Sequence, residues 1–225
     1  MKTTLPIRSV LIKEKLDDIV KEILDVAESK IAMIILFGSY ARGKWVQDEY
    51  TIGHITYSYQ SDLDLMLVLK KGKYVGHLGL RIEEKIEKRL EKKLLRDPLS
   101  KEPWITLVLE SINMVNTQLE KGHYFFSDIK KEGILLYDSG EFQLSEAKKL
   151  PWGERKQIAK EDYEYWFGRG KGFFIDCKYP LERKEYALSS FYLHQATESF
   201  YNAILLVFSG YKPKLHDIRK LGGIY

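Results

Sequence analysis

The stretch IAMIILFGSYARG, residues 31–43, decides the fold of the first half of the chain. Its first seven residues are continuously apolar, which favours a short buried strand, and the run ends in a turn at Gly38 and Ser39. Upstream, residues 11–30 carry apolar side chains at helical spacing. Downstream, residues 62–69 alternate as a strand does, because every second side chain points to the same face. One face of this second strand carries Leu63, Leu65, Leu67 and Leu69.

The same periodicities continue along the chain until a polar stretch near residues 138–153, which Pro and Gly punctuate at its end. Before this stretch strands alternate with helices, and after it only helical patterns remain. We therefore predict an α/β part followed by an all-α part. The predicted strands are 105–109 and 134–137, and the predicted helices are 80–96, 112–121, 125–131, 154–166 and 182–209.

Composition excludes several classes of protein. The chain has 225 residues, a formal net charge of +4 and a single cysteine, Cys177. No apolar run approaches the roughly 20 residues of a membrane span, so we expect no membrane partner. One cysteine forms neither an intrachain disulfide nor a thiolate zinc site, which points to a reducing, cytoplasmic setting. The mild positive charge does not by itself argue for nucleic acid.

The candidate functional residues lie in the turn after the first predicted strand and at the start of the second. Gly38 leaves room for a phosphate to approach the backbone, and Ser39 adds a hydroxyl donor. Asp62 and Asp64 lie two residues apart on a strand, so their carboxylates project from one face. Two like charges placed together are costly unless a cation neutralises them, and carboxylates suit Mg²⁺. The pattern indicates a site for a nucleotide and a metal ion.

At these residues the sequence resembles the polymerase-β-like nucleotidyltransferase superfamily, whose signature is a hydrophobic-Gly-Ser turn followed by Asp-x-Asp. The resemblance implies a short mixed sheet flanked by helices. It further implies that Gly38 and Ser39 hold a nucleoside triphosphate, with ATP expected, and that Asp62 and Asp64 hold Mg²⁺ or Mn²⁺. Arg42 matches the motif and is expected to contact the nucleotide.

Two departures from the family pattern bear on activity. An insertion, roughly residues 44–60, separates the two motifs and carries four aromatic side chains: Trp45, Tyr50, Tyr57 and Tyr59. Active members also place a third carboxylate on a neighbouring strand, and here the expected position holds Thr106. Glu110 would lie on the same face of this strand, because an even number of residues separates it from Thr106, but it comes four residues later. Either Glu110 substitutes as a catalytic carboxylate, or the domain only binds nucleotide.

The helical part resembles the HEPN family through LHQATE at residues 193–198, GYKP at 210–213 and HD at 216–217. Some HEPN proteins are ribonucleases that use an Arg followed four to six residues later by a His. No histidine of this chain has that spacing, which disfavours a ribonuclease. The helical part is short for a four-helix bundle, so we expect a truncated domain that forms a homo-oligomer. The pair His194 and Glu198 is read as a structural hydrogen bond.

These observations predict a nucleotidyltransferase domain at residues 1–140, a linker at 141–153 and a HEPN-like domain at 154–225. The leading hypothesis is Mg²⁺-dependent transfer of a nucleoside monophosphate, AMP from ATP, to an unidentified hydroxyl acceptor on a protein, an RNA or a small molecule. The alternative is a degenerate nucleotide-binding protein in a regulatory or toxin–antitoxin-like unit. Catalytic roles are predicted for Asp62, Asp64 and Glu110.

Overall fold

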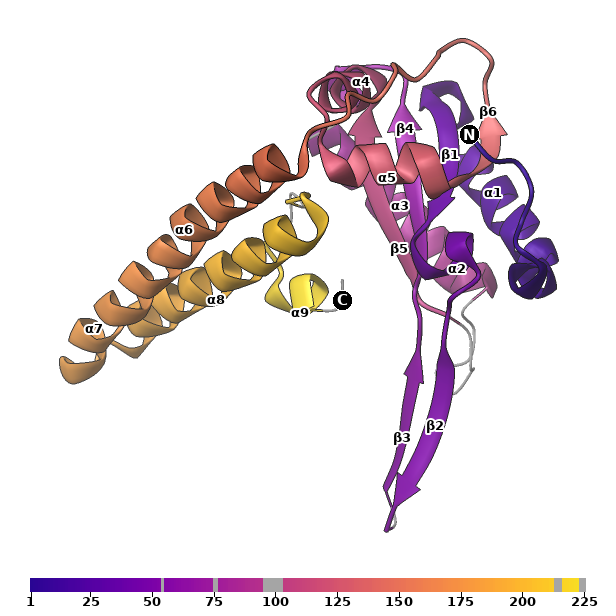
Figure 1. Cartoon of the computed structure of the whole chain (residues 1–225). Coiled ribbons are helices and arrows are strands. Elements are labelled where there is room, and N and C mark those ends of the chain that lie inside the picture. The colour runs from indigo at the N-terminus through magenta and orange to yellow at the C-terminus, as the bar shows by residue number, and fades with distance from the viewer. Residues whose placement is uncertain (54, 75–76, 95–102, 213–215, 223–225) are drawn as a thin grey trace. The chain divides into compact units, whose positions relative to one another are not determined.

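A computed structural model of the chain describes residues 1–53, 55–74, 77–94, 103–212 and 216–222 (Figure 1). Two units emerge from its tertiary contacts. The first is Met1–Gly122 with Phe126–Lys148, and the second is His123–Phe125 with Lys149–Tyr225. The first unit is α/β with a small mixed sheet and the second is all helical. The predicted fold class is confirmed at this level.

The α/β unit contains most of the short elements. It begins with a 3-10 helix, Ile7–Ile12, that leads into the first α-helix. The helices of this unit are α1 (Lys13–Ala27), α2 (Gly38–Arg42), α3 (His77–Leu94), α4 (Ile112–Glu120) and all but the first two residues of α5 (Tyr124–Glu132), and 3-10 turns lie at Glu28–Lys30 and Gly72–Tyr74. The strands are β1 (Ile31–Phe37), β2 (Gln47–Ile52), β3 (Ile55–Gln60), β4 (Leu63–Leu69), β5 (Ile105–Ser111) and β6 (Ile134–Asp138).

Four strands form the main sheet in the order β5-β4-β1-β6. β4 runs parallel to β5 and antiparallel to β1, which in turn is antiparallel to β6. The two central strands are almost wholly buried, which explains why β1 is continuously apolar. The leucine face of β4 joins a core with α1 and α3, as its alternation predicted. Asp62 and Asp64 therefore lie toward the opposite face of the sheet.

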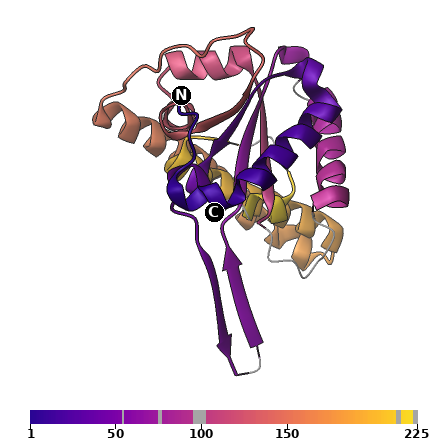
Figure 2. The same ribbon diagram turned by 90° about the vertical axis from the view of Figure 1, so that its right-hand side faces the viewer.

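β2 and β3 form a separate two-stranded hairpin that projects from the rest of the α/β unit (Figures 1 and 2). Six residue pairs join the strands, from Gln47 with Gln60 to Ile52 with Ile55. This hairpin occupies most of the insertion at 44–60, for which no strand was predicted. Apolar and polar residues alternate at 50–52 and again at 55–60, and Gly53 begins the turn with a φ of +65°.

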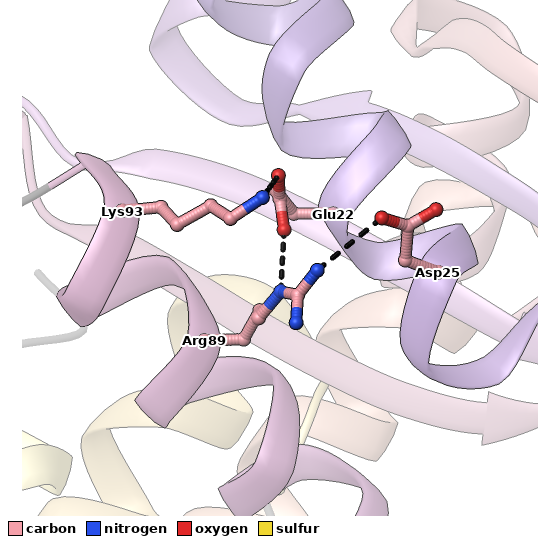
Figure 3. A network of polar contacts seen from close by, with 4 residues as sticks. All are labelled: Glu22, Asp25, Arg89 and Lys93. Atoms are coloured by element: carbon pink, nitrogen blue, oxygen red, sulfur yellow. Dashed lines mark hydrogen bonds and ion pairs between the residues drawn. The ribbon is translucent and has the colours of Figure 1, made fainter.

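A cluster of charged side chains joins α1 to α3 (Figure 3). Glu22 is only 6% exposed, although it lies on a helix. Its carboxylate accepts hydrogen bonds from Arg89 Nε at 2.6 Å and Lys93 Nζ at 2.5 Å. Arg89 also donates to Asp25 at 3.3 Å. Hydrogen bonds from Lys93, then from Arg89, lower the pKa of Glu22.

We expect Glu22→Gln to destabilise the α/β unit in a pH-dependent way. A carboxyl with a lowered pKa contributes stability above its ordinary pKa, and that stability is lost as the pH falls through the folded-state value. The difference in unfolding free energy between wild type and Glu22→Gln should therefore be constant above about pH 5 and shrink below pH 4.5. Chemical denaturation at several pH values measures it.

Glu84→Gln is the matched control, because Glu84 pairs with Lys88 on the surface of α3, where both side chains are more than half exposed. Its effect on the free energy of unfolding should be much smaller, because ion pairs exposed to solvent contribute little. An equal loss in both variants would contradict a special role for the buried cluster.

The helical unit consists of α6 (Trp152–Asp176), α7 (Lys178–Glu182), α8 (Tyr186–Ser209) and α9 (Ile218–Gly222). α6 is longer than predicted, and it packs along α8 through pairs such as Phe167 with Phe200 and Phe173 with Tyr192. α8 is apolar on more than one face, so several large side chains stay exposed beside it. These are Leu188, Phe191, Leu193, Ile204 and Phe208. Within the described ranges no helix is long and apolar enough to cross a membrane.

Candidate functional site

The paired aspartates lie where β4 begins. Asp64 faces Phe37 on β1 across one side of the strand and Thr106 on β5 across the other. Phe37 is the last residue of β1 and directly precedes Gly38, so the strand pairing brings the glycine turn to the aspartates. Two sequence motifs separated by 22 residues therefore meet at one end of the sheet.

Gly38 makes the close approach possible. Its φ is +72°, and a Cβ added there would lie 2.1 Å from Oδ2 of Asp64 and 3.0 Å from its Cγ. Real side chains do not approach a carboxylate so closely, so only glycine fits without moving Asp64. The positive φ also disfavours any residue with a Cβ. The glycine of the predicted motif is therefore required by the position of the second aspartate.

Burial and mutual repulsion disfavour ionisation of the pair. Desolvation, with a further contribution from the negative charge of Asp62, raises the pKa of Asp64 to about 7, whereas Arg42 opposes the shift. Desolvation also raises the pKa of Asp62. Since ionised carboxylates are this unfavourable here, a bound cation would be strongly stabilised. The donor set, two carboxylates, is one that Mg²⁺ accepts.

The other predicted nucleotide ligands lie beside the pair. Ser39 is the second residue of α2, directly after Gly38, and its carbonyl accepts a hydrogen bond from the Lys44 amide at 2.9 Å. Arg42 ends α2, with its guanidinium 3.7 Å from a carboxylate oxygen of Glu132 and half exposed. This long contact at the surface holds the side chain weakly. Arg42 is close enough to Asp64 to lower its pKa, so a positive charge faces the site.

The structure does not bring Glu110 to the aspartates. In the parallel pairing of β4 and β5, Asp64 aligns with Thr106, whereas Glu110 aligns with Val68. Four residues of strand separate the two positions by about 13 Å. Glu110 is also only 4% exposed. Glu110 does lie on the same face of β5 as Thr106, as the sequence predicted. The register between β4 and β5, however, places Thr106 rather than Glu110 beside the aspartates. Among the residues described, no three His, Cys, Asp or Glu side chains are arranged to hold a metal ion.

A stack of side chains that was not predicted supports the turn. Tyr40 stacks on Trp45 with ring centroids 5.2 Å apart, and Arg8 lies over Trp45 at 4.5 Å. Tyr40 is buried, its pKa is raised mainly by desolvation, and its side chain hydrogen-bonds with Gln60. Ser9 donates to the Tyr40 carbonyl at 2.7 Å, so the N-terminal segment also holds α2. The aromatic content of the insertion was a signal, but its partners lie on other elements.

Ser61 ties the base of the hairpin to the site. Its amide donates to the Val46 carbonyl, and its hydroxyl accepts from the Val46 amide, both at 2.9 Å. The residue directly after this double link is Asp62. The hairpin is thus anchored between the glycine turn and the aspartate pair.

The helical unit holds its own buried polar group. Glu198 is buried on α8, and its Oε1 lies 3.0 Å from Nδ1 of His216. Gln195 donates to its other oxygen at 3.5 Å. The histidine that contacts Glu198 is therefore His216, which follows α8, rather than the expected His194. The contact joins two of the segments on which the HEPN resemblance rests.

Comparison with protein families identifies a known domain in the helical unit. A HEPN domain model matches residues 163–224, which lie entirely in the helical unit. The chain therefore carries a HEPN domain there, as its sequence predicted. A search of curated proteins found no match.

Proposed function

We propose that the α/β unit is a metal-dependent nucleotidyltransferase that moves a nucleoside monophosphate, AMP from ATP, to a hydroxyl acceptor. The observation that carries the proposal is the aspartate pair, of which Asp64 packs against Gly38 and has its pKa raised to about 7. A partly buried carboxylate pair is costly to the fold and is retained where function needs it. The pair suits a divalent cation, and the adjoining turn carries the Gly-Ser motif that the nucleotidyltransferase resemblance assigns to the triphosphate.

In the proposed reaction the acceptor hydroxyl forms a bond to the α-phosphorus. The bond from that phosphorus to the bridging oxygen breaks, and pyrophosphate leaves with the electron pair. Asp62 and Asp64 would hold Mg²⁺, which supplies charge stabilisation to the phosphoryl oxygens. Gly38 and Ser39 would orient the triphosphate, and Arg42 would add a positive charge beside it. The acceptor proton would pass to solvent, since the position next to Asp64 holds Thr106 rather than a carboxylate.

The register of Thr106 also favours a second candidate, a nucleotide-binding regulator that works with the HEPN domain as a toxin–antitoxin-like unit. Such a protein would bind ATP through the same turn and transfer nothing. The two candidates differ in one measurable property, which is the appearance of the labelled nucleotide on an acceptor.

We expect the full chain, incubated with Mg²⁺ and ATP labelled at the α-phosphate, to release pyrophosphate and transfer label, and Asp62→Asn to lose both. Thr106→Asp should raise the rate of transfer about tenfold or more. The new carboxylate lies in register with Asp64, where it can take the proton from the attacking hydroxyl group. Thr51→Asp, on the exposed strand β2, is the matched control for an added charge.

Nucleotide binding without transfer in wild type and in Thr106→Asp, across protein, RNA and sugar acceptors, would favour the regulator. Transfer that survives in Asp62→Asn would remove the metal site from the proposal.

The exposed apolar side chains of α8 support a further part of the proposal, in which a second copy of the chain covers this helix. Large apolar surfaces on a helix are stable only when another element covers them. Sedimentation of wild type and of Phe208→Ser measures this association.

A further inference from the structure

Arg42 interacts with carboxylates that come from both sides of β1. The sheet order places β4, which carries Asp64, on one side of β1, and β6 on the other. Glu132 is the last residue of α5, and one residue, Gly133, separates it from β6. Among the residues that the structure describes, the carboxylate within 4 Å of the Arg42 guanidinium is that of Glu132. Burial and Asp62 raise the pKa of Asp64, and Arg42 opposes this rise. Glu132 and Asp64 therefore share one positive charge.

The backbone fixes the place of Glu132. The amide of Gly133 donates to the Ile129 carbonyl at 2.8 Å, at the end of α5. A Cβ at Gly133 would lie 2.5 Å from this carbonyl oxygen and 3.2 Å from the carbonyl oxygen of Leu36 on β1. Ile134 then pairs with Leu36 near the end of β1. The chain thus passes tightly against β1, and Glu132 is held at the end of the sheet where the glycine turn begins.

The ion pair between Arg42 and Glu132 is one that a stronger ligand can replace. The distance from Nη1 to Oε2 is 3.7 Å, which is too long for a hydrogen bond, and the two side chains are 48% and 36% exposed. Solvent-exposed ion pairs of this kind contribute little. A phosphate group, in contrast, accepts two parallel hydrogen bonds from one guanidinium. Arg42 should therefore leave Glu132 when a triphosphate occupies the glycine turn.

The same exchange runs in reverse when the product leaves. Pyrophosphate holds the guanidinium by the same kind of contact as the triphosphate does, and Glu132 offers it an alternative partner. A carboxylate that competes for Arg42 weakens the binding of both anions. Such a loss of uniform binding raises KM but keeps the site from remaining filled with product.

We propose that Glu132 is a positioning residue that competes with the triphosphate for Arg42, so that it weakens nucleotide binding and hastens the release of pyrophosphate. This inference rests on the proposed binding of a triphosphate at the glycine turn, and not on the transfer that follows. Arg42 would lie beside Glu132 before the nucleotide binds and beside the phosphates afterwards. Glu132 itself touches neither the nucleotide nor the metal.

Calorimetric titration of the full chain with Mg²⁺ at low salt tests the exchange. One probe is an ATP analogue with a methylene group between the α- and β-phosphorus, which cannot release pyrophosphate. The other is inorganic tripolyphosphate, which has neither base nor sugar. We expect Glu132→Gln to bind both probes about threefold more tightly than wild type, a gain that misfolding would not produce. Arg42→Gln should bind both about tenfold more weakly.

The double variant shows whether Glu132 acts through Arg42. In the Arg42→Gln background, Glu132→Gln should leave both affinities unchanged, because the side chain for which it competes is gone. An equal gain in both backgrounds would mean that Glu132 repels the phosphates directly, and would overturn the positioning role. Glu185→Gln is the matched control and should change nothing, since it removes the carboxylate of another exposed ion pair, Arg183 with Glu185.

Kinetics separates a failure of this inference from a failure of the proposed function. With ATP labelled at the α-phosphate, Glu132→Gln should lower KM by a factor similar to the gain in affinity and should not raise kcat. Transfer with equal affinities in wild type and Glu132→Gln would overturn the role of Glu132 and leave the proposed function standing. The expected affinities without transfer would contradict the proposed function and leave the role of Glu132 standing. If neither probe binds to wild type, both are overturned.

Discussion

Asp64→Asn is expected to abolish nucleotidyl transfer and, in the absence of metal, to make the protein more stable at pH 8. Both effects follow from one carboxyl group that lies between Phe37, Thr106 and Gly38. Burial and the neighbouring Asp62 make its ionised form unfavourable, which raises its pKa to about 7. An amide of the same shape removes the charge, the repulsion and a metal ligand together.

The sign of the pH dependence follows from linkage. A carboxyl whose folded-state pKa is raised binds its proton more tightly in the folded protein, so stability falls as the pH rises from the ordinary value of 3.8 to about 7. Above pH 7 the loss is complete, and the pKa difference corresponds to roughly 4 kcal/mol as an upper limit. The advantage of Asp64→Asn should grow across this interval and then stay constant.

Thermal denaturation with a chelator, at several pH values, measures the effect, and Asp18→Asn on the exposed face of α1 is the control. Added Mg²⁺ should raise the melting temperature of wild type at pH 8 and leave Asp64→Asn unchanged. If Asp64→Asn were less stable than wild type at pH 8 without metal, the carboxylate pair would not be the unfavourable feature inferred above.

Gly38→Ala should lower transfer by about a hundredfold or more, because a shift of about 1 Å in a catalytic group is sufficient for such a loss. The new methyl carbon would lie 2.1 Å from Oδ2 of Asp64, so the carboxylate or the turn must move. Alanine at a φ of +72° also carries backbone strain of about 1–2 kcal/mol.

Gly140→Ala separates the effect of backbone strain from that of the collision with Asp64. Gly140 has a φ of +74°, and no atom lies within 4 Å of the position that a Cβ would take. Its alanine variant should therefore show similar strain and full transfer. Comparison of pyrophosphate release and melting temperature in the two variants measures the part of the effect that comes from Asp64. Equal activity in both would show that the close approach at Gly38 is not needed for the reaction.

Much of the fold could be predicted from local patterns. The apolar run at 31–37 became the central strand β1, and the leucine alternation of β4 became the face under α1 and α3. These predictions succeeded because a strand or helix must bury its apolar face whatever its neighbours are. The strands of the insertion at 44–60 were not predicted. Its strand β2 is exposed, so no buried face marks that strand in the sequence.

Part of the candidate site could likewise be predicted from local patterns, and part could not. Gly38, Asp62 and Asp64 could be found from the sequence, because a turn after a strand and an alternating carboxylate pair are local features. Glu110 shows the limit. Its parity was correct, but only the register between β4 and β5 decides that Thr106 lies next to Asp64. The support of Tyr40 by Arg8, Ser9 and Trp45 likewise joins segments whose contact no local pattern predicts.

The sequence by itself determined an α/β part with a glycine turn and a carboxylate pair, followed by a HEPN domain, because these features depend on neighbours along the chain. The tertiary structure alone decided the order β5-β4-β1-β6, the contact of Asp64 with Gly38 and the buried cluster around Glu22. It also decided that the insertion is a projecting hairpin rooted at the aspartates. Strand order, register and burial of a charge depend on which distant segments pack together, and that choice is made by the whole chain.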